Sequence, residues 1–201
     1  MKNFNQRAWL VSNPNLWNWG RDIQIKLLQE RLNLQKSNYL LDFGCGVLRG
    51  GIHIIDYLDS GHYYGIEKDN IRLDEAKLEL ADNNLEHKLP ILGNDFSIVD
   101  KLIDVIWCWE VFIHLEDNIL DESIKKMSRL MKNSSKIYST VNITTEYMED
   151  GRWHEYPVKY KNLSFYENIA NKHNLKIHIM SAIGNGEHNF THTHLIWTKG
   201  V

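Results

Sequence analysis

The segment LLDFGCG at residues 40–46 decides the fold of this chain of 201 residues. The short apolar run from Tyr39 to Phe43 predicts a buried strand. Gly44 and Gly46 end that run and predict a tight turn, because glycine lacks a Cβ and tolerates positive φ angles. In open α/β sheets, ligands bind outside the carboxyl ends of the strands. We therefore expect the backbone of the turn to approach a ligand closely.

The next predicted strand ends in an acidic residue that fits the same ligand. Residues 63–66 read as a second short strand, and Glu67 follows it, 21 residues after Gly46. A carboxylate placed there can accept hydrogen bonds from both hydroxyls of a ribose. A glycine turn followed by an acid one strand later is typical of sites that bind an adenine nucleoside.

The position of the third glycine of the motif distinguishes a nicotinamide dinucleotide from other ligands that contain adenosine. A dinucleotide fingerprint, Gly-x-Gly-x-x-Gly, requires glycine at position 49, where this chain has Arg49. Asp42, before the turn, also suits a ligand with a positive amino group better than one with a pyrophosphate. These residues favour S-adenosylmethionine (SAM) over a nicotinamide dinucleotide. An NAD(P)-dependent oxidoreductase and a non-catalytic SAM-binding module remain as alternatives.

The rest of the chain alternates strand and helix patterns. This alternation predicts an α/β Rossmann-like fold, with a seven-stranded, mostly parallel sheet and helices on both faces. The last two strands, separated by a glycine-containing break at 184–186, are expected to pair antiparallel. The expected strands cover residues 39–43, 63–66, 89–92, 103–109, 136–141, 175–180 and 192–198, and the expected helices 21–34, 50–58, 70–83, 118–131 and 164–172.

Four motifs occur in a familiar order along the chain: LDFGCG at 41–46, YGIE at 64–67, NDF at 94–96, and IDVI at 103–106 continuing to VFIHL at 111–115. In this order they resemble the motifs of class I SAM-dependent methyltransferases, of a small bacterial type. The chain departs from the common pattern at Val47-Leu48, where many members have a small residue and a third glycine. The resemblance implies that the chain is an enzyme that transfers the methyl group of SAM.

The resemblance also implies a role for each matching residue. The methionine portion would face the strand end and turn, the ribose would meet the acid, and the adenine would lie against the third motif. Trp109 would lie near the sulfonium. The implied cofactor-binding residues are Asp42, Gly44, Cys45, Gly46, Glu67, Asn94, Asp95, Phe96 and Trp109.

Two residues after the fourth predicted strand are candidates for acid-base chemistry. A base is needed only where the methyl acceptor must lose a proton, as many hydroxyl acceptors do. His114 has a near-neutral intrinsic pKa, and Glu110 lies four residues before it. A purely structural role for His114, ordering the loop or capping a helix, stays open.

The acceptor pocket is expected where aromatic and histidine residues gather. Residues 1–37 are expected to form an N-terminal helical lid segment, and residues 144–163 a substrate-side insertion. A mixture of aromatic rings, imidazoles and carboxylates suits a small polar molecule, such as a sugar or glycan precursor with a free hydroxyl. The candidate substrate-binding residues are Trp17, Trp153, His154, Tyr156, His188 and His192.

Composition sets limits on the remaining possibilities. The net charge is −3 with acids and bases interleaved, which argues against nucleic-acid binding. Apolar runs are too short to span a bilayer, and two cysteines imply no disulfide framework, so we expect a cytoplasmic protein. His192 and His194 share a strand face, but their spacing matches no closed zinc site, and no metal is expected. The length predicts one domain over residues 1–201, and the oligomeric state is left open.

Overall fold

A computed structural model describes residues 4–11, 14–144, 148–150, 157–180 and 192–200. The chain divides into two compact units, Met1–Val105 and Ile106–Val201, which are described in turn. Strand β4 (Ile103–Cys108) crosses the boundary between them. The expectation of one domain over the whole chain stays a prediction.

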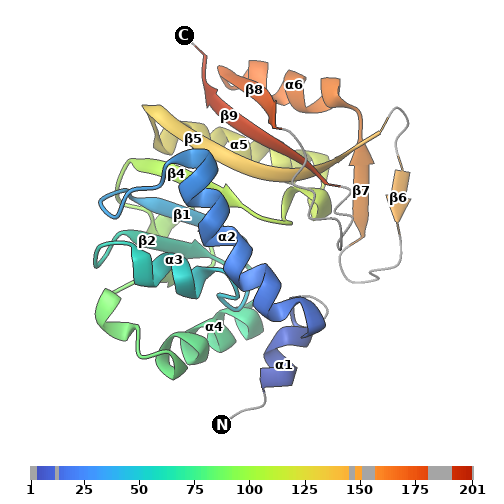
Figure 1. The fold of residues 1–201 in the computed structure, drawn as a ribbon. Coiled ribbons are helices and arrows are strands. Elements are labelled where there is room, and N and C mark those ends of the chain that lie inside the picture. Colours follow the sequence, from blue (N-terminus) through green and yellow to red (C-terminus); the bar gives the residue numbers. More distant parts are fainter. Residues whose placement is uncertain (1–3, 12–13, 145–147, 151–156, 181–191, 201) are drawn as a thin grey trace. The chain divides into compact units, whose positions relative to one another are not determined.

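The first unit carries the opening strands and the helices between them (Figure 1). Asp69 caps the N-terminus of one of these helices, because its carboxylate accepts hydrogen bonds from the backbone N–H groups of Ile71 and Arg72. The elements are α1 (Phe4–Trp9), η1 (Pro14–Leu16), α2 (Trp17–Leu32), β1 (Leu40–Phe43), α3 (Gly51–Tyr57), β2 (Tyr63–Ile66), α4 (Asn70–Asp82), η2 (Glu86–Lys88), β3 (Ile91–Gly93) and η3 (Phe96–Ile98).

The strands of this unit form a parallel sheet in which β2 lies between β1 and β3. Phe43 is level with Ile66, and Ile66 is level with Gly93, so all three strands end at the same height. The first residues of β4 continue the sheet beyond β1, because Asp104 N–H donates to the carbonyl of Tyr39. The loops that follow β1, β2 and β3 therefore emerge along one edge of this sheet.

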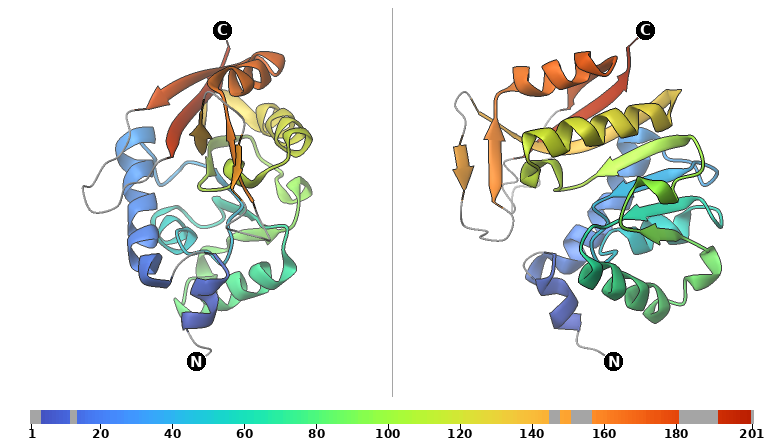
Figure 2. Two further views of the ribbon diagram at one scale, coloured as in Figure 1. Left: turned by 90° about the vertical axis from the view of Figure 1, so that its right-hand side faces the viewer. Right: turned by 180° about the vertical axis from the view of Figure 1, so that it is seen from behind.

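Helices α2 and α3 lie on the same side of β1 and β2 (Figures 1 and 2). Glycines allow this close packing. A Cβ at Gly50 would overlap the side chain of Gln24, and one at Gly51 would come within 2.6 Å of the Tyr63 hydroxyl. The glycines at the start of α3 therefore allow that helix to pack closely against α2 and β2.

The second unit contains two long helices and a mixed set of strands. In the right-hand view of Figure 2, α5 and α6 run beside each other over the strands of this unit. Asp121 on α5 bonds both Lys172 and His173 at the end of α6. The elements are η4 (Phe112–His114), α5 (Asp117–Leu130), β5 (Met131–Ile143), β6 (Met148–Asp150), β7 (Val158–Lys161), α6 (Leu163–Lys172), β8 (Leu175–Met180) and β9 (Thr193–Lys199).

Strand β9 pairs antiparallel with both β5 and β8, which confirms the expected antiparallel C-terminal strand pair. Two short strands were not predicted: β7 pairs parallel with the end of β5, and β6 pairs antiparallel with β7. Both fall in the expected insertion at 144–163. They raise the number of strands in the described residues to nine, against seven expected.

The register of β5 against β9 separates two faces. Ile137 is level with Trp197, and the Trp197 indole N–H donates to the hydroxyl of Ser139 at 2.9 Å. Phe112 and Tyr166 pack edge-on against the same indole. This face forms an apolar core with α6, and the opposite face of β5 and β9 carries different chemistry, described below.

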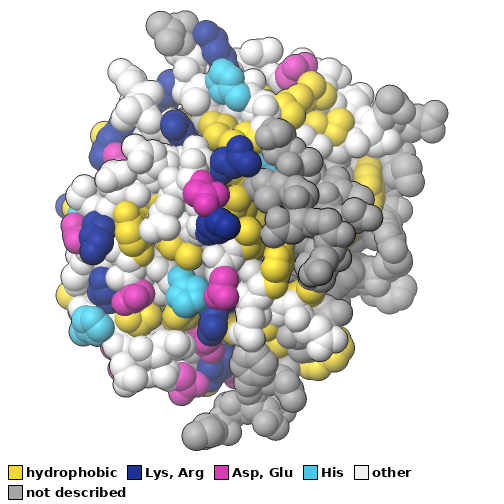
Figure 3. Space-filling model, viewed as in Figure 1, with side chains coloured by type: hydrophobic (Ala, Val, Ile, Leu, Met, Phe, Trp, Pro, Cys, Tyr) yellow, Lys and Arg dark blue, Asp and Glu magenta, His cyan; other side chains and the backbone are white. Residues whose placement is uncertain are grey.

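The predicted α/β architecture is confirmed, with local shifts at element ends. Helix α2 begins four residues earlier than expected and β5 begins at Met131 rather than at residue 136. None of the helices in the described part of the chain has the length and apolar character that crossing a bilayer requires. On the face drawn in Figure 3, basic and acidic side chains are interspersed.

Candidate functional site

The turn after β1 has the backbone conformation that its glycines allow. Gly44 and Gly46 have φ angles of +79° and +56°, a region that favours glycine. The N–H groups of Gly44 and Cys45 both donate to the carbonyl of Ile66, at 2.8 and 3.0 Å. The turn is thereby attached to the end of β2.

Glu67 closes the other side of this turn. Its Oε2 accepts a hydrogen bond from Gly46 N–H at 3.0 Å, and its Oε1 accepts one from Asp69 N–H at 2.9 Å. The side chain is buried. The expectation that the glycine turn and this acid lie together is confirmed by these distances, and the binding of a ribose by Glu67 stays a prediction.

Asp42 lies beneath the turn and is held by a tyrosine that the sequence analysis did not identify. Tyr63 donates its hydroxyl proton to Asp42 Oδ2 at 2.6 Å. Burial raises the pKa of Asp42 to about 7, the tyrosine hydrogen bond opposes the rise, and the charge of Glu67 adds to it. A signal for Tyr63 exists in the sequence, because strand residues two apart share a face and Tyr63 is two positions before Gly65. Gly65 is level with Asp42 in the parallel pair, so Tyr63 lies on the same face as Asp42.

The residues after β3 form the third part of this edge. Asp95 accepts a hydrogen bond from Ser97 N–H at 2.7 Å and so caps η3, which is the ordinary turn role of an aspartate. The ring of Phe96 stacks on that of Phe43, with centroids 5.4 Å apart. Asn94 and Asp95 are exposed. Phe96 therefore lies against the end of β1, and the binding of adenine by Asn94, Asp95 and Phe96 stays a prediction.

The N-terminal segment packs onto the glycine turn. Ala8, Trp17 and Val47 form one buried cluster, and Val11 packs against it. A Cβ at Gly46 would come within 2.9 Å of Val11 Cγ1. Trp17 is buried in this cluster, and its expected contact with substrate stays a prediction.

A buried arginine fixes this segment to α4. The Arg7 guanidinium bonds Glu75 at 2.9 Å and Asp82 at 2.8 Å, and it also bonds Glu79. Burial opposes the charge of Arg7, and the carboxylates outweigh burial, so its pKa rises above the ordinary value. No pattern in the sequence indicates this cluster, because the three carboxylates lie 68 to 75 positions after Arg7 and share no motif with it.

In the second unit, Trp109 and Glu110 follow β4. Glu110 has a φ angle of +56°, which is strained for a residue with a side chain, and its N–H donates to Thr140 Oγ1 at 2.7 Å. The Trp109 ring stacks parallel to those of Trp107 and Tyr138, at centroid distances of 5.6 and 6.4 Å. Its indole N–H is buried and has no hydrogen-bond partner among the described residues.

Two histidines face β5: His194 on β9, and His192, the residue just before β9. His194, level with Thr140, places its Nδ1 against the Tyr138 hydroxyl. His192 places its Nδ1 against Asn142 Oδ1. Burial lowers the pKa of His192, and the charge of Glu110 opposes that shift. The expectation that His192 and His194 share a face is confirmed by their contacts with Asn142 and Tyr138, which are on one face of β5.

The other predicted site residues are less defined by the structure. His114 lies half-buried at the end of η4, and its catalytic role stays a prediction. Four candidate substrate residues lie outside the described residues: Trp153, His154, Tyr156 and His188.

The sequence matches no protein-family model and no curated protein significantly. The structure resembles many solved structures, with low sequence identity. Magnesium protoporphyrin IX methyltransferase from Synechocystis PCC 6803, solved with bound SAM, is 14% identical, with a TM-score of 0.66 over 100% of this chain and 85% of that one. An S-adenosylmethionine-dependent methyltransferase from Clostridium acetobutylicum is 14% identical, with a TM-score of 0.67 over 98% and 96%.

The CcbJ methyltransferase from Streptomyces caelestis is 12% identical, with a TM-score of 0.64 over 92% of this chain and 90% of that one. These alignments extend over nearly the whole chain in each case. They confirm the architecture that the ordered motifs implied. The chain has the fold of the class I S-adenosylmethionine-dependent methyltransferases.

Proposed function

We propose that this protein is an enzyme that transfers the methyl group of SAM to a small polar acceptor, at a hydroxyl of a sugar or glycan precursor. The observation that carries the proposal is the hydrogen bond from Gly46 N–H to Glu67 Oε2, which joins the glycine turn to the acid at the ends of adjacent parallel strands. Low cysteine content, with both thiols free and buried, favours a cytoplasmic location.

The residues at this edge fit the three parts of SAM. Glu67 is placed to accept hydrogen bonds from ribose hydroxyls, since a carboxylate has about four lone-pair sites and two accept the backbone bonds described. Asp42 is a buried carboxyl with a pKa of about 7, and a cationic amino group beside it would favour its charged form. Phe96 offers a flat surface for adenine. The solved neighbour with bound SAM supports this reading.

The environment of Arg49 argues against a nicotinamide dinucleotide. Its guanidinium is buried against α2, where a Cβ on Gly20 would come within 2.8 Å of Arg49 Cζ. The position of the third fingerprint glycine is thus used for packing a long side chain between helices. A pyrophosphate needs a glycine there so that the helix can approach it closely.

When bound, SAM supplies a methyl carbon that is activated by the positive sulfur next to it. The protein's own part is then to bind, orient and exclude water. Glu110 and His114 are our sequence-based candidates for accepting the proton of a hydroxyl acceptor. The candidate acceptor contacts are Trp17, Trp153, His154, Tyr156, His188 and His192.

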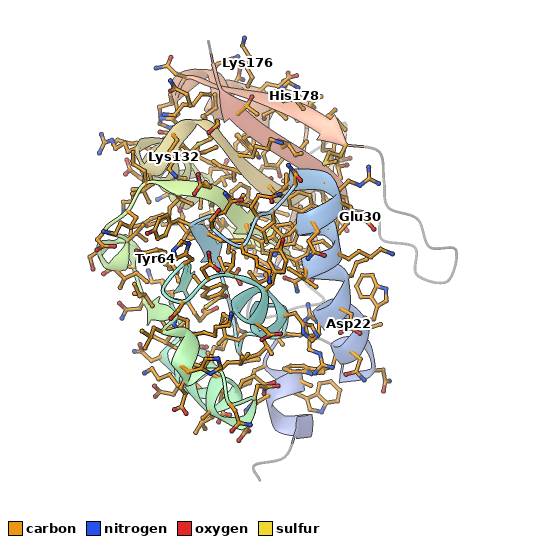
Figure 4. The ribbon with its side chains drawn as sticks, turned by 60° about the vertical axis from the view of Figure 1, so that its left-hand side comes forward. Asp22, Glu30, Tyr64, Lys132, Lys176 and His178 are labelled. Carbon is orange, nitrogen blue, oxygen red and sulfur yellow. The ribbon has the colours of Figure 1, made fainter. Side chains whose placement is uncertain are left out.

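Calorimetry with SAM and with NAD tests the cofactor assignment. We expect SAM to bind and NAD to bind at least tenfold more weakly. Glu67→Gln should weaken SAM binding by about 1.5 to 3 kcal/mol, a rise in Kd of about 10- to 150-fold, because a hydrogen bond to a charged acceptor is lost. Glu30→Gln, on the exposed side of α2 (Figure 4), is the matched control and should leave Kd unchanged. Equal Kd values for all three proteins would contradict the ribose role of Glu67.

Turnover separates an enzyme from a binding module. The purified protein is incubated with SAM and a panel of sugars, sugar phosphates, phenols and amines, and S-adenosylhomocysteine is measured. Acceptor-dependent release of S-adenosylhomocysteine is expected with a hydroxyl compound. Tight SAM binding with no turnover on any member of a broad panel would favour the non-catalytic alternative.

A further inference from the structure

One face of β5 and β9 gathers polar side chains within the second unit. Strand residues two apart point to the same side, so Tyr138, Thr140 and Asn142 share this face of β5. His194 is level with Thr140 and therefore shares it, and His192, just before β9, contacts Asn142 on the same face. Glu110 N–H donates to Thr140 Oγ1 at 2.7 Å, which places the turn after β4 beside this group. We call these residues the polar face.

The contact between His192 and Asn142 fixes which ring nitrogen of the histidine carries the proton. His192 Nδ1 lies in hydrogen-bond contact with the side-chain oxygen of Asn142. An amide oxygen only accepts hydrogen bonds, so Nδ1 must be the donor. In the neutral ring, the basic lone pair is then on Nε2. Asn142 thus orients the imidazole and sets its tautomer.

Two buried donors lack an acceptor within the described part of the chain: one belongs to Asn142 itself, and the other to Trp109, whose ring packs against Tyr138 and His194 of this face. Asn142 is 1% exposed and Trp109 is 9% exposed. Asn142 Nδ2 and Trp109 Nε1 have no hydrogen-bond partner among the residues that the structure describes. Leaving a buried N–H group without a partner costs about 1 to 3 kcal/mol, so native proteins rarely do so without a ligand, water or functional reason. Both groups donate, so they call for a ligand with oxygen acceptors.

We propose that the polar face binds the acceptor molecule through its oxygen atoms, and that Nε2 of His192 takes the proton from the hydroxyl that becomes methylated. Asn142 is a positioning residue for this base. The inference rests on the proposed function and gives His192 the role for which the sequence offered Glu110 and His114 as candidates.

The proton and electron balance of the step is simple. The hydroxyl oxygen forms a bond to the methyl carbon, and the electron pair of the broken carbon–sulfur bond stays on sulfur. The hydroxyl proton moves to Nε2, which makes His192 an imidazolium, and is then released to water. The charge of Glu110 stabilises that imidazolium, while burial lowers the pKa of His192 and so favours the neutral ring before the transfer. The other ionisable groups on this face are Tyr138 and His194.

Nitrogen NMR of the histidine rings tests the assignment without knowledge of the acceptor. Protein labelled with nitrogen-15 in histidine is saturated with SAM, and the His192 signals are identified by their loss in His192→Gln. At pH 7 we expect a neutral ring protonated at Nδ1, and we expect Asn142→Leu to abolish that preference. A neutral ring protonated at Nε2, or an imidazolium at pH 7, would overturn the proposal, because Nε2 would have no lone pair to accept a proton.

His178→Gln is the matched control. His178 is an exposed histidine on β8 (Figure 4), and its Nε2 contacts the hydroxyl of Thr198. Its replacement should leave the His192 signals and turnover unchanged. SAM affinity is measured on the same samples, so failure to bind SAM would reject the proposed function, whereas normal binding with the wrong tautomer would reject only the role of His192.

Kinetics with the best acceptor of the panel gives a second readout. Removal of a general base typically lowers the rate by about 100- to 10,000-fold. We expect that loss in kcat for His192→Gln, with the Kd for SAM unchanged. We also expect smaller losses for acceptors whose hydroxyl is already ionised at the assay pH, since they need no base. Full turnover by His192→Gln would overturn the assignment.

Discussion

Replacing Asp42 with asparagine should change how the stability of this protein depends on pH. Asp42 is buried, and burial raises its pKa from the ordinary 3.8 to about 7. Between those values the unfolded chain has lost the proton while the folded chain keeps it. The folded state then binds more protons than the unfolded state, so the free energy of unfolding falls as the pH rises. Asparagine cannot ionise, so Asp42→Asn removes this fall and can still accept the hydrogen bond from Tyr63.

The size of the effect follows from the two pKa values. A difference of one in pKa corresponds to about 1.36 kcal/mol, so a rise from 3.8 to about 7 corresponds to about 4 kcal/mol in total. Of this, about 1.5 kcal/mol is lost below pH 5 and about 2.5 kcal/mol between pH 5 and pH 8. The wild type should therefore lose about 2.5 kcal/mol relative to Asp42→Asn over that pH interval.

Urea unfolding at pH 5, 6, 7 and 8, followed by circular dichroism, measures this difference. The difference in unfolding free energy between the variant and the wild type should grow steadily with pH. Glu30→Gln, which removes an exposed carboxylate, should follow the wild type. Saturating SAM should flatten the wild-type curve, because a cationic amino group next to Asp42 favours the carboxylate. Parallel curves for wild type and Asp42→Asn without ligand would refute the buried, nearly neutral carboxyl.

Two further substitutions test the attachment of the N-terminal segment. Gly46→Ala adds a Cβ at a positive φ and within 2.9 Å of Val11, whereas the control Gly61→Ala adds one at a positive φ in open space. Thermal unfolding should therefore show a larger loss of stability for Gly46→Ala, and calorimetry should show weaker SAM binding for Gly46→Ala alone. Equal losses of stability would exclude the close contact. Arg7→Met leaves the buried carboxylate of Glu79 and the partly buried carboxylate of Glu75 without their partner, and should lower the unfolding free energy by about 1 to 3 kcal/mol. Lys77→Met, which breaks an exposed pair, should change it by less than about 0.5 kcal/mol. A similar loss for both would contradict a stabilising role for the Arg7 ion pairs.

The glycine turn and its acid could be predicted from sequence because local chemistry determines them. Apolar residues before Gly44 predict a strand, the glycines predict the turn, and parallel strands place Glu67 at the same edge. The proximity of Gly46 N and Glu67 Oε2 then follows from the order of the strands in the sheet alone.

Elements without a hydrophobic period were missed. β6 and β7 are three and four residues long, too short for an alternating pattern to stand out. The polar residues 132–135 at the start of β5 favour a turn by composition, but the structure has them in an extended conformation. The side chain of Ser135 accepts a hydrogen bond from Lys132 N–H. Local bonds of this kind are common in turns, which is why a polar composition favours a turn here.

Contacts between distant positions depend on register, which this sequence does not specify by itself. Asn142 and His192 are 50 residues apart, and their contact follows from the pairing of β5 with β9. A shift of one residue would turn every β9 side chain to the other face and would place His192 and His194 in the apolar core. Trp197 prevents that shift, because its large ring fills the core beneath α6 and its indole N–H bonds Ser139. Trp197, on the opposite face, therefore fixes the register that brings His192 to its positioning residue Asn142.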